Sequence, residues 1–156
     1  MTKQEECFVH FKFCITSLNN AWQVLNTIRK QPPDNPLIGP AFRFALIEYS
    51  KPYQSSRGLY KSWKKLDTTH IPEKYIPLHE RIITSRDQIH AHSDLTPMQP
   101  TLHINEFMGE RYTLISQNII YGTEDIQNLT EIIALIEASL DNMYIEEKVL
   151  EKKLTT

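Results

Sequence analysis

Two long runs of regularly spaced apolar residues, one near each end of the chain, constrain the fold most. In the first run, apolar side chains step by three and four positions, at Phe8, Phe11, Ile15, Leu18, Trp22 and Leu25. The second run has the same rhythm, at Ile126, Leu129, Ile133, Ile136, Leu140 and Met143, and resumes at Leu150 and Leu154. This spacing is typical of a narrow apolar stripe on an α-helix. It predicts one helix over about residues 4–30, which ends at QPPDNP, and another from a Thr123 cap to near the end of the chain.

The segment between these helices predicts three shorter elements. Residues 38–53, IGPAFRFALIEYSKPY, are apolar almost all the way round, which indicates a buried central helix ending near Pro52. A short helical turn is expected at 59–66. Pro77 opens a further helix whose inward face carries Leu78, Ile82 and Ile89, with Pro97 and Pro100 as its outer limit. TLHIN, EFMGE and RYTLIS then predict a small β-hairpin near 101–116.

These elements predict a single domain, 1–156, of the mainly α class. We expect an up-and-down bundle of four to five helices with long terminal helices and the small inserted hairpin. A chain of 156 residues can bury roughly two thirds of its unfolded surface, which is enough for a real core. Because narrow apolar stripes of about 40 Å often pair between subunits, a homodimer is also expected.

Charge and cysteine spacing narrow the classes of function. The formal charge of −2 argues against a chain-wide electrostatic hold on nucleic acid, although it allows a local basic patch. Cys7 and Cys14 would lie two helical turns apart, about 10 Å, which is too far for a disulfide. No apolar run reaches the ~20 residues of a membrane span, and MTKQEEC lacks a signal-peptide pattern, so the cytoplasm is the expected compartment.

Residues 57–66, RGLYKSWKKL, form a local basic segment. It contains Arg57, Lys61, Lys64 and Lys65 with Tyr60 and Trp63, and no acidic residue. Cations mixed with stacking rings are typical of surfaces that bind single-stranded RNA. A solvated lysine face with inward-packed rings explains the same pattern, and both interpretations stay open.

A second polar cluster, RDQIHAHSDLT, occupies residues 86–96 in a chain that has six histidines. One interpretation is a helix C-terminus, where Arg86, His90 and His92 would favour the negative end of the helix dipole. Another is metal binding, because HAHSD resembles the start of the HxHxDH signature of the metallo-β-lactamase superfamily. That match fails at Leu95, and alternate positions on a helix point about 200° apart, so no metal site is predicted. The other histidines, His10, His70, His79 and His103, are isolated and are expected to be half-buried.

The third interpretation rests on Arg86, Asp87 and His92. An arginine, a small polar residue and then a histidine six positions after the arginine, on a late helix of a small helical protein, resemble the R-x4-6-H motif of the HEPN superfamily. RDQIHAHSDL is similar in particular to HEPN-like proteins of bacterial abortive infection. The resemblance implies a metal-independent endoribonuclease without a cofactor, in which the motifs of two subunits line one cleft. It also implies that His92 transfers protons, Arg86 stabilises the phosphate and Asp87 orients one of them.

The geometry of a regular helix limits how Arg86 and His92 could act together. Positions 86 and 92 lie about 120° apart on a straight helix, so their side chains would meet only if the helix bends near Ala91 or if they act across a dimer. His90 shares the face of Arg86 and is the substitute for His92. The expected partners are RNA, a second subunit, and a nucleotidyltransferase-type or other antitoxin. The alternative function is a non-catalytic HEPN-like helical module that docks RNA or protein.

Overall fold

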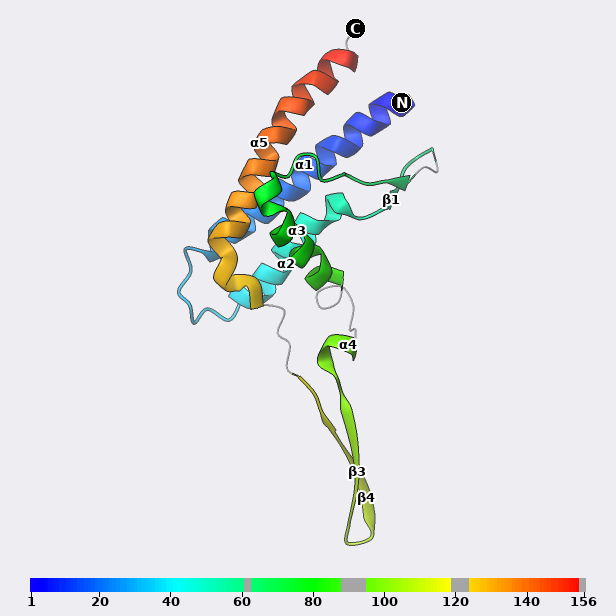
Figure 1. Cartoon of the computed structure of the whole chain (residues 1–156), viewed down its shortest axis with the longest axis vertical. Coiled ribbons are helices and arrows are strands. Elements are labelled where there is room, and N and C mark those ends of the chain that lie inside the picture. Colours follow the sequence, from blue (N-terminus) through cyan, green and yellow to red (C-terminus); the bar gives the residue numbers. More distant parts are fainter. Residues whose placement is uncertain (61–62, 88–94, 119–123, 155–156) are drawn as a thin grey trace.

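Three helices, α1 (Lys3–Ile28), α2 (Ile38–Ser50) and α5 (Leu129–Leu154), form the body of the protein in the computed structural model (Figure 1). The structure describes residues 1–60, 63–87, 95–118 and 124–154. Helix α1 packs against both α2 and α5. The two long helices α1 and α5 lie side by side with the chain termini at the same end (Figure 1), so they are antiparallel.

Helix α1 confirms the first predicted helix. Thr2 caps it through a capping box, in which the Glu5 amide donates to the Thr2 hydroxyl and the Thr2 amide donates to the Glu5 carboxylate. The predicted apolar stripe faces the core, as the burial of Phe11, Ile15, Leu18 and Leu25 shows. Trp22, which the pattern places in the core, is half-buried instead, and its indole N–H donates to the Glu137 carboxylate at 2.8 Å.

Helix α5 confirms the second predicted helix, with a different first turn. A 3-10 helix, η4 (Glu124–Asn128), precedes the α-helix that begins at Leu129, and Thr123, the predicted cap, lies outside the described residues. The stripe is buried along the body of the helix, at Ile133, Ile136, Leu140 and Met143. Leu150 and Leu154 are half-buried near its end.

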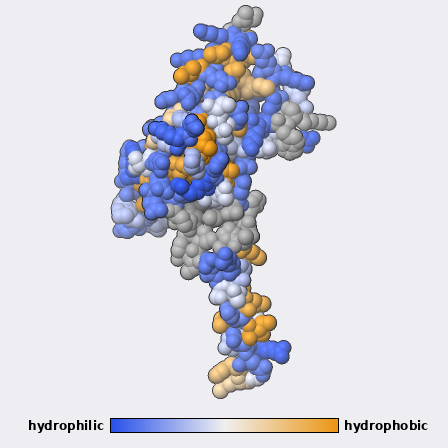
Figure 2. Space-filling view, in the orientation of Figure 1, coloured by the Kyte–Doolittle hydropathy of each residue, from blue (hydrophilic) through white to orange (hydrophobic). Residues whose placement is uncertain are grey.

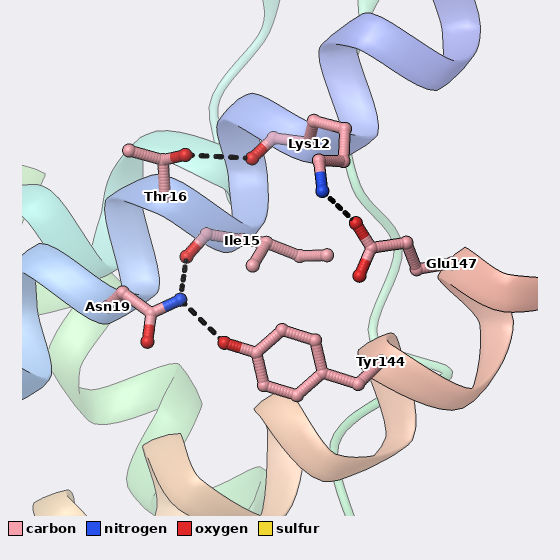
Figure 3. Close-up of polar contacts among 6 residues, drawn as sticks. All are labelled: Lys12, Ile15, Thr16, Asn19, Tyr144 and Glu147. Atoms are coloured by element: carbon pink, nitrogen blue, oxygen red, sulfur yellow. Dashed lines mark hydrogen bonds and ion pairs between the residues drawn. The ribbon is translucent and has the colours of Figure 1, made fainter. Parts of the chain in front are cut away.

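Polar side chains join α1 to α5 beside the apolar stripes (Figure 3). Lys12 forms an ion pair with Glu147, and the Asn19 amide donates to the Tyr144 hydroxyl at 2.8 Å. The Thr16 hydroxyl donates to the Lys12 carbonyl one turn earlier, at 3.0 Å. The two contacts between α1 and α5 fix the register of these helices, because each contact pairs residues at the same height on both helices.

Helix α2 is the predicted central helix, but one of its faces is exposed. Phe42 and Tyr49 are fully buried, and Pro40 lies in the first turn, where its missing N–H costs nothing. Phe44, by contrast, is 50% exposed, so the expectation of burial all round is wrong. The helix passes into a 3-10 turn, η1 (Lys51–Tyr53).

The helical turn expected at 59–66 is wrong. This part of the chain forms a ribbon in which β1 (Ser56–Arg57) pairs antiparallel with β2 (Trp63–Lys64). Contacts with the start of α1 explain the difference: the Leu59 amide donates to the Glu6 carboxylate and the Tyr60 hydroxyl donates to the Met1 carbonyl. An eight-residue helix is too weak to compete with such contacts.

Helix α3 (Ile76–Ser85) follows a 3-10 turn, η2 (Glu73–Tyr75), and carries the predicted Pro77 in its first turn. Its inward residues Leu78 and Ile82 are buried, whereas Ile89 lies outside the described residues. The α-helix ends at Ser85 and continues as a wider π-helical turn at 86–87, and the rest of the predicted helix lies outside the described residues. Helix α4 (Leu95–Met98) is a single turn.

The predicted hairpin is confirmed. Strand β3 (Thr101–Phe107) pairs antiparallel with β4 (Glu110–Ser116) around Met108 and Gly109, and both loop residues have positive φ, 52° and 82°. The hairpin extends away from the helical body (Figure 1), and nearly all its side chains are exposed. The protein is therefore mainly helical with a small antiparallel hairpin. Within the described residues, no helix is long and apolar enough to cross a membrane.

Candidate functional site

Arg86 lies where α3 ends, and its side chain is mostly covered. Its backbone N–H caps the helix by donating to the Ile82 and Ile83 carbonyls. The guanidinium Nη1 donates to the Asp87 carboxylate at 2.7 Å, and the Arg86 side chain is 23% exposed. Its Nε–H is buried and has no hydrogen-bond partner among the described residues. The predicted pair Arg86 and Asp87 is thus joined by an ion pair.

The two candidate histidines, His90 and His92, lie outside the described residues. Of the four predicted catalytic residues, the structure therefore describes Arg86 and Asp87. Their convergence with the histidines remains a prediction.

Arg86 lines a surface hollow of ≈ 400 Å³, here called the Arg86 hollow. Helix α1 contributes one wall, and the chain from Lys51 to Ser56 contributes the other. The lining side chains are mostly polar or basic around an aromatic ring, and they include His10, Phe13, Ser17, Lys51, Gln54, Ser55, Ser56 and Arg86. Such a mixture offers donors to phosphate oxygens.

His10 is a site residue that the sequence did not indicate. It shares the Arg86 hollow, and its Nε2 lies 3.3 Å from the Ser56 hydroxyl. Burial lowers the pKa of His10 and the nearby Lys64 charge lowers it further, while Glu6 opposes them. The ring is therefore neutral near pH 7 and can accept a proton. No local pattern marks His10, because its neighbours in the hollow come from distant parts of the chain.

Cys14, one turn after His10, is not an activated nucleophile. Its sulfur lies 3.8 Å from His10 Nδ1, but burial raises the pKa of the thiol to about 11. The thiol therefore stays protonated at neutral pH. Cys7 is also free, as the spacing of the two cysteines predicted.

The predicted basic segment runs beside these residues. Arg57 is exposed, next to Ser56 on the wall of the Arg86 hollow. Lys64 donates to the Cys7 sulfur at 2.9 Å, and Lys65 is exposed. Tyr60 is 45% exposed, whereas Lys61 and the side chain of Trp63 lie outside the described part of the chain. Arg57 and Lys65 are thus the exposed cations of the described part of the segment, and its RNA-binding role stays a prediction.

A second hollow, of ≈ 340 Å³, meets the first and is here called the Leu59 hollow. The two hollows share His10, Phe13 and Ser56. Arg57, Leu59 and Lys64 line the second hollow together with Met1, Glu6 and Val9 from the start of the chain. Helix α1 lines both hollows, through His10 and Phe13, and Arg86 at the end of α3 lines the first of them.

His79, Tyr49 and Tyr53 form a buried cluster, and His79 and Tyr53 line a hollow together with Lys65 and Leu66. The Tyr49 hydroxyl and His79 Nδ1 share a hydrogen bond of 2.8 Å, and the Tyr53 ring packs edge-on against His79 with centroids 4.5 Å apart. Burial, and then the charge of Lys65, lower the pKa of His79 to about 4. Burial raises the pKa of both tyrosines, so the whole cluster is uncharged near pH 7.

No group of three or more potential metal ligands occurs within the described ranges. Comparison with protein-family models, with curated proteins and with solved structures found no match to this chain.

Proposed function

We propose that this protein is a HEPN-like, metal-independent endoribonuclease that cleaves RNA at a site composed by two subunits, and that it acts as a toxin or phage-defence effector. The observation that carries the proposal is the position of Arg86. Its guanidinium is oriented by Asp87 and lines a hollow whose other side chains suit a phosphodiester. The family resemblance of residues 86–94 supplies the reaction class.

The reaction needs one cation and proton transfer at two oxygens. The ribose 2′ oxygen attacks the adjacent phosphorus, and the bond from phosphorus to the 5′ oxygen breaks. A neutral histidine takes the 2′-hydroxyl proton, and a protonated histidine gives a proton to the leaving oxygen. Arg86 stabilises the charge that develops on the phosphoryl oxygens.

A composite dimer site resolves the geometric difficulty of the motif. On a regular helix Arg86 and His92 would point about 120° apart, so the arginine of one subunit would serve the histidine of the other. Two copies of His92 would also supply the proton acceptor and the proton donor. The up-and-down HEPN-type bundle, the homodimer and a nucleotidyltransferase-type or other antitoxin partner belong to this same proposal.

Cleavage of RNA in the presence of EDTA tests the proposal. Arg86→Ala and His92→Ala should each abolish cleavage without a change in melting temperature. The matched controls are Arg43→Ala, at an exposed arginine of α2, and His103→Ala, at an exposed histidine of the hairpin, and both should cleave like the wild type. Cleavage retained by the Arg86 variant would refute the assignment, and a requirement for zinc would refute the metal-independent chemistry.

The exposed hairpin favours the second candidate function, a non-catalytic docking module. Figure 2 shows hydrophobic side chains along the hairpin, where Leu102, Ile104 and Ile115 are each at least 60% exposed on one face. An isolated two-stranded hairpin is marginally stable in water, so these side chains suit contact with another molecule. Absence of any RNA cleavage by the wild type, together with dimerisation or capture of a partner through the hairpin, would favour this function.

A further inference from the structure

The Arg86 and Leu59 hollows are neighbours on α1, and we call the two together the α1 groove. The two hollows meet at His10, Phe13 and Ser56, which line both of them. Their volumes of ≈ 400 and ≈ 340 Å³ are each within the usual range for a bound small molecule. A ligand longer than one such unit can therefore extend from Arg86 to Arg57 along α1.

The charge along this groove is opposite to that of the chain as a whole. Its described lining contains four cationic side chains, Lys51, Arg57, Lys64 and Arg86, and one acidic side chain, Glu6. Glu6 is buried, and one of its carboxylate oxygens accepts the Leu59 amide hydrogen. Glu48 and Asp87 pair with Lys51 and Arg86, and Lys64 donates to the Cys7 sulfur and interacts with the Glu6 charge. Arg57 has no ion-pair partner among the described residues.

Phe13 gives the groove an exposed aromatic ring. It is 66% exposed where the two hollows meet, although most aromatic rings on the same helix are at least half-buried. Stacking on such a ring is independent of base identity, because every base has a flat face. Ser17, Gln54 and Ser55 add hydroxyl and amide groups that can contact ribose and phosphate oxygens.

We propose that the α1 groove holds a single strand of RNA, with the Phe13 ring stacked on a base and Arg57 and Arg86 contacting phosphates on either side of it. This inference rests on the proposed function and names the path that the substrate takes to Arg86. A purely apolar protein segment is a poorer fit, because it offers no anionic partner to Arg57.

A short 2′-O-methyl oligoribonucleotide is the probe that separates binding from cleavage, because it has no free 2′-hydroxyl to attack phosphorus. Its affinity for the full chain is measured by fluorescence anisotropy. Phe13→Ala should lower the affinity roughly 5- to 100-fold, the range expected for loss of one base stack. Phe44→Ala removes another exposed phenylalanine outside the groove and should change the affinity less than about twofold.

A second pair of matched variants tests the cationic end of the groove. Arg57→Gln should reduce the steepness of the salt dependence by about 0.7, the value for one phosphate of a single strand, while Arg43→Gln on α2 should not. Equal effects of Phe13→Ala and Phe44→Ala, or no binding by the wild type, would overturn the inference. If natural RNA is cleaved and Phe13→Ala cleaves it at the wild-type rate, the inference fails while the nuclease stands. If the probe binds as expected but natural RNA stays intact, the nuclease fails while the groove stands.

Discussion

Acid should destabilise this protein through His79, and the change that tests it is His79→Gln. The residue is only 6% exposed, and its pKa of about 4 lies below the ordinary value of 6.5 that it regains on unfolding. Between these two pH values the unfolded chain binds a proton that the folded chain does not. The free energy of unfolding is therefore highest above about pH 6.5 and falls as the pH drops toward about 4.

The size of the effect follows from the two pKa values. A difference of about 2.5 between them corresponds to at most about 3.4 kcal/mol, at 1.36 kcal/mol for each tenfold change. The ring also borders a hollow lined by Lys65 and Asp67, and solvent there screens the protonated form. We therefore expect His79 to account for a loss of about 2 kcal/mol between pH 7 and about pH 4.5.

Urea unfolding at a series of pH values measures this loss. A glutamine side chain cannot titrate in this pH range, but its amide can still hydrogen-bond the Tyr49 hydroxyl. The pH dependence of H79Q should therefore be flatter than that of the wild type by about 2 kcal/mol. His103→Gln is the matched control, because this imidazole lies on the exposed hairpin. Parallel pH curves for the wild type and the His79 variant would refute the reasoning.

Two further predictions concern single positions. Lys64→Gln should raise the pKa of His10 in an NMR titration, because the Lys64 charge lowers that pKa, whereas burial should keep it below 6.5. Lys65→Gln is the control. Equal effects of the two changes on the pKa of His10 would contradict the role given to the Lys64 charge. Met108→Asn should stabilise the hairpin by about 1 kcal/mol. Met108 has a φ of 52°, is 89% exposed and precedes Gly109, and Asn-Gly is the favoured pair in such a turn. Slower amide hydrogen exchange in β3 and β4 would show this, whereas Gly109→Ala should accelerate exchange.

Local periodicity was sufficient to predict most of the fold. The stripes from Phe11 to Leu25 and from Ile133 to Met143 are buried because a spacing of three and four places one side of a helix against its neighbour. The hairpin was equally local, since Gly109 and the apolar runs around it specify the turn and both strands. The mainly helical class with a small hairpin therefore follows from residues close together in the sequence.

The errors arose where long-range contacts override local preference. The segment around Leu59 has a pattern compatible with a helical turn, but Leu59 and Tyr60 contact Glu6 and Met1 instead, beyond the paired strands β1 and β2. Phe44 was expected to be buried because α2 is apolar on nearly every side, yet one face of that helix has no covering element among the described residues. A sequence pattern gives the surface that a helix can bury, whereas the neighbours decide how much of it is buried.

The candidate site shows the same division between local and distant information. The motif identified Arg86 and Asp87, which are adjacent and form an ion pair. It could not identify His10 or Phe13, which are distant in the sequence and which α1 brings to the hollow that Arg86 lines. The motif alone does not distinguish stabilising the phosphate charge from holding the RNA strand, whereas the positions of these residues do. Arg86 can stabilise phosphate charge only when a strand is held against it, and under the proposal above Phe13 and His10 on α1 would hold the strand there. Under the proposed dimer, the partner subunit's His92 would supply the proton transfer.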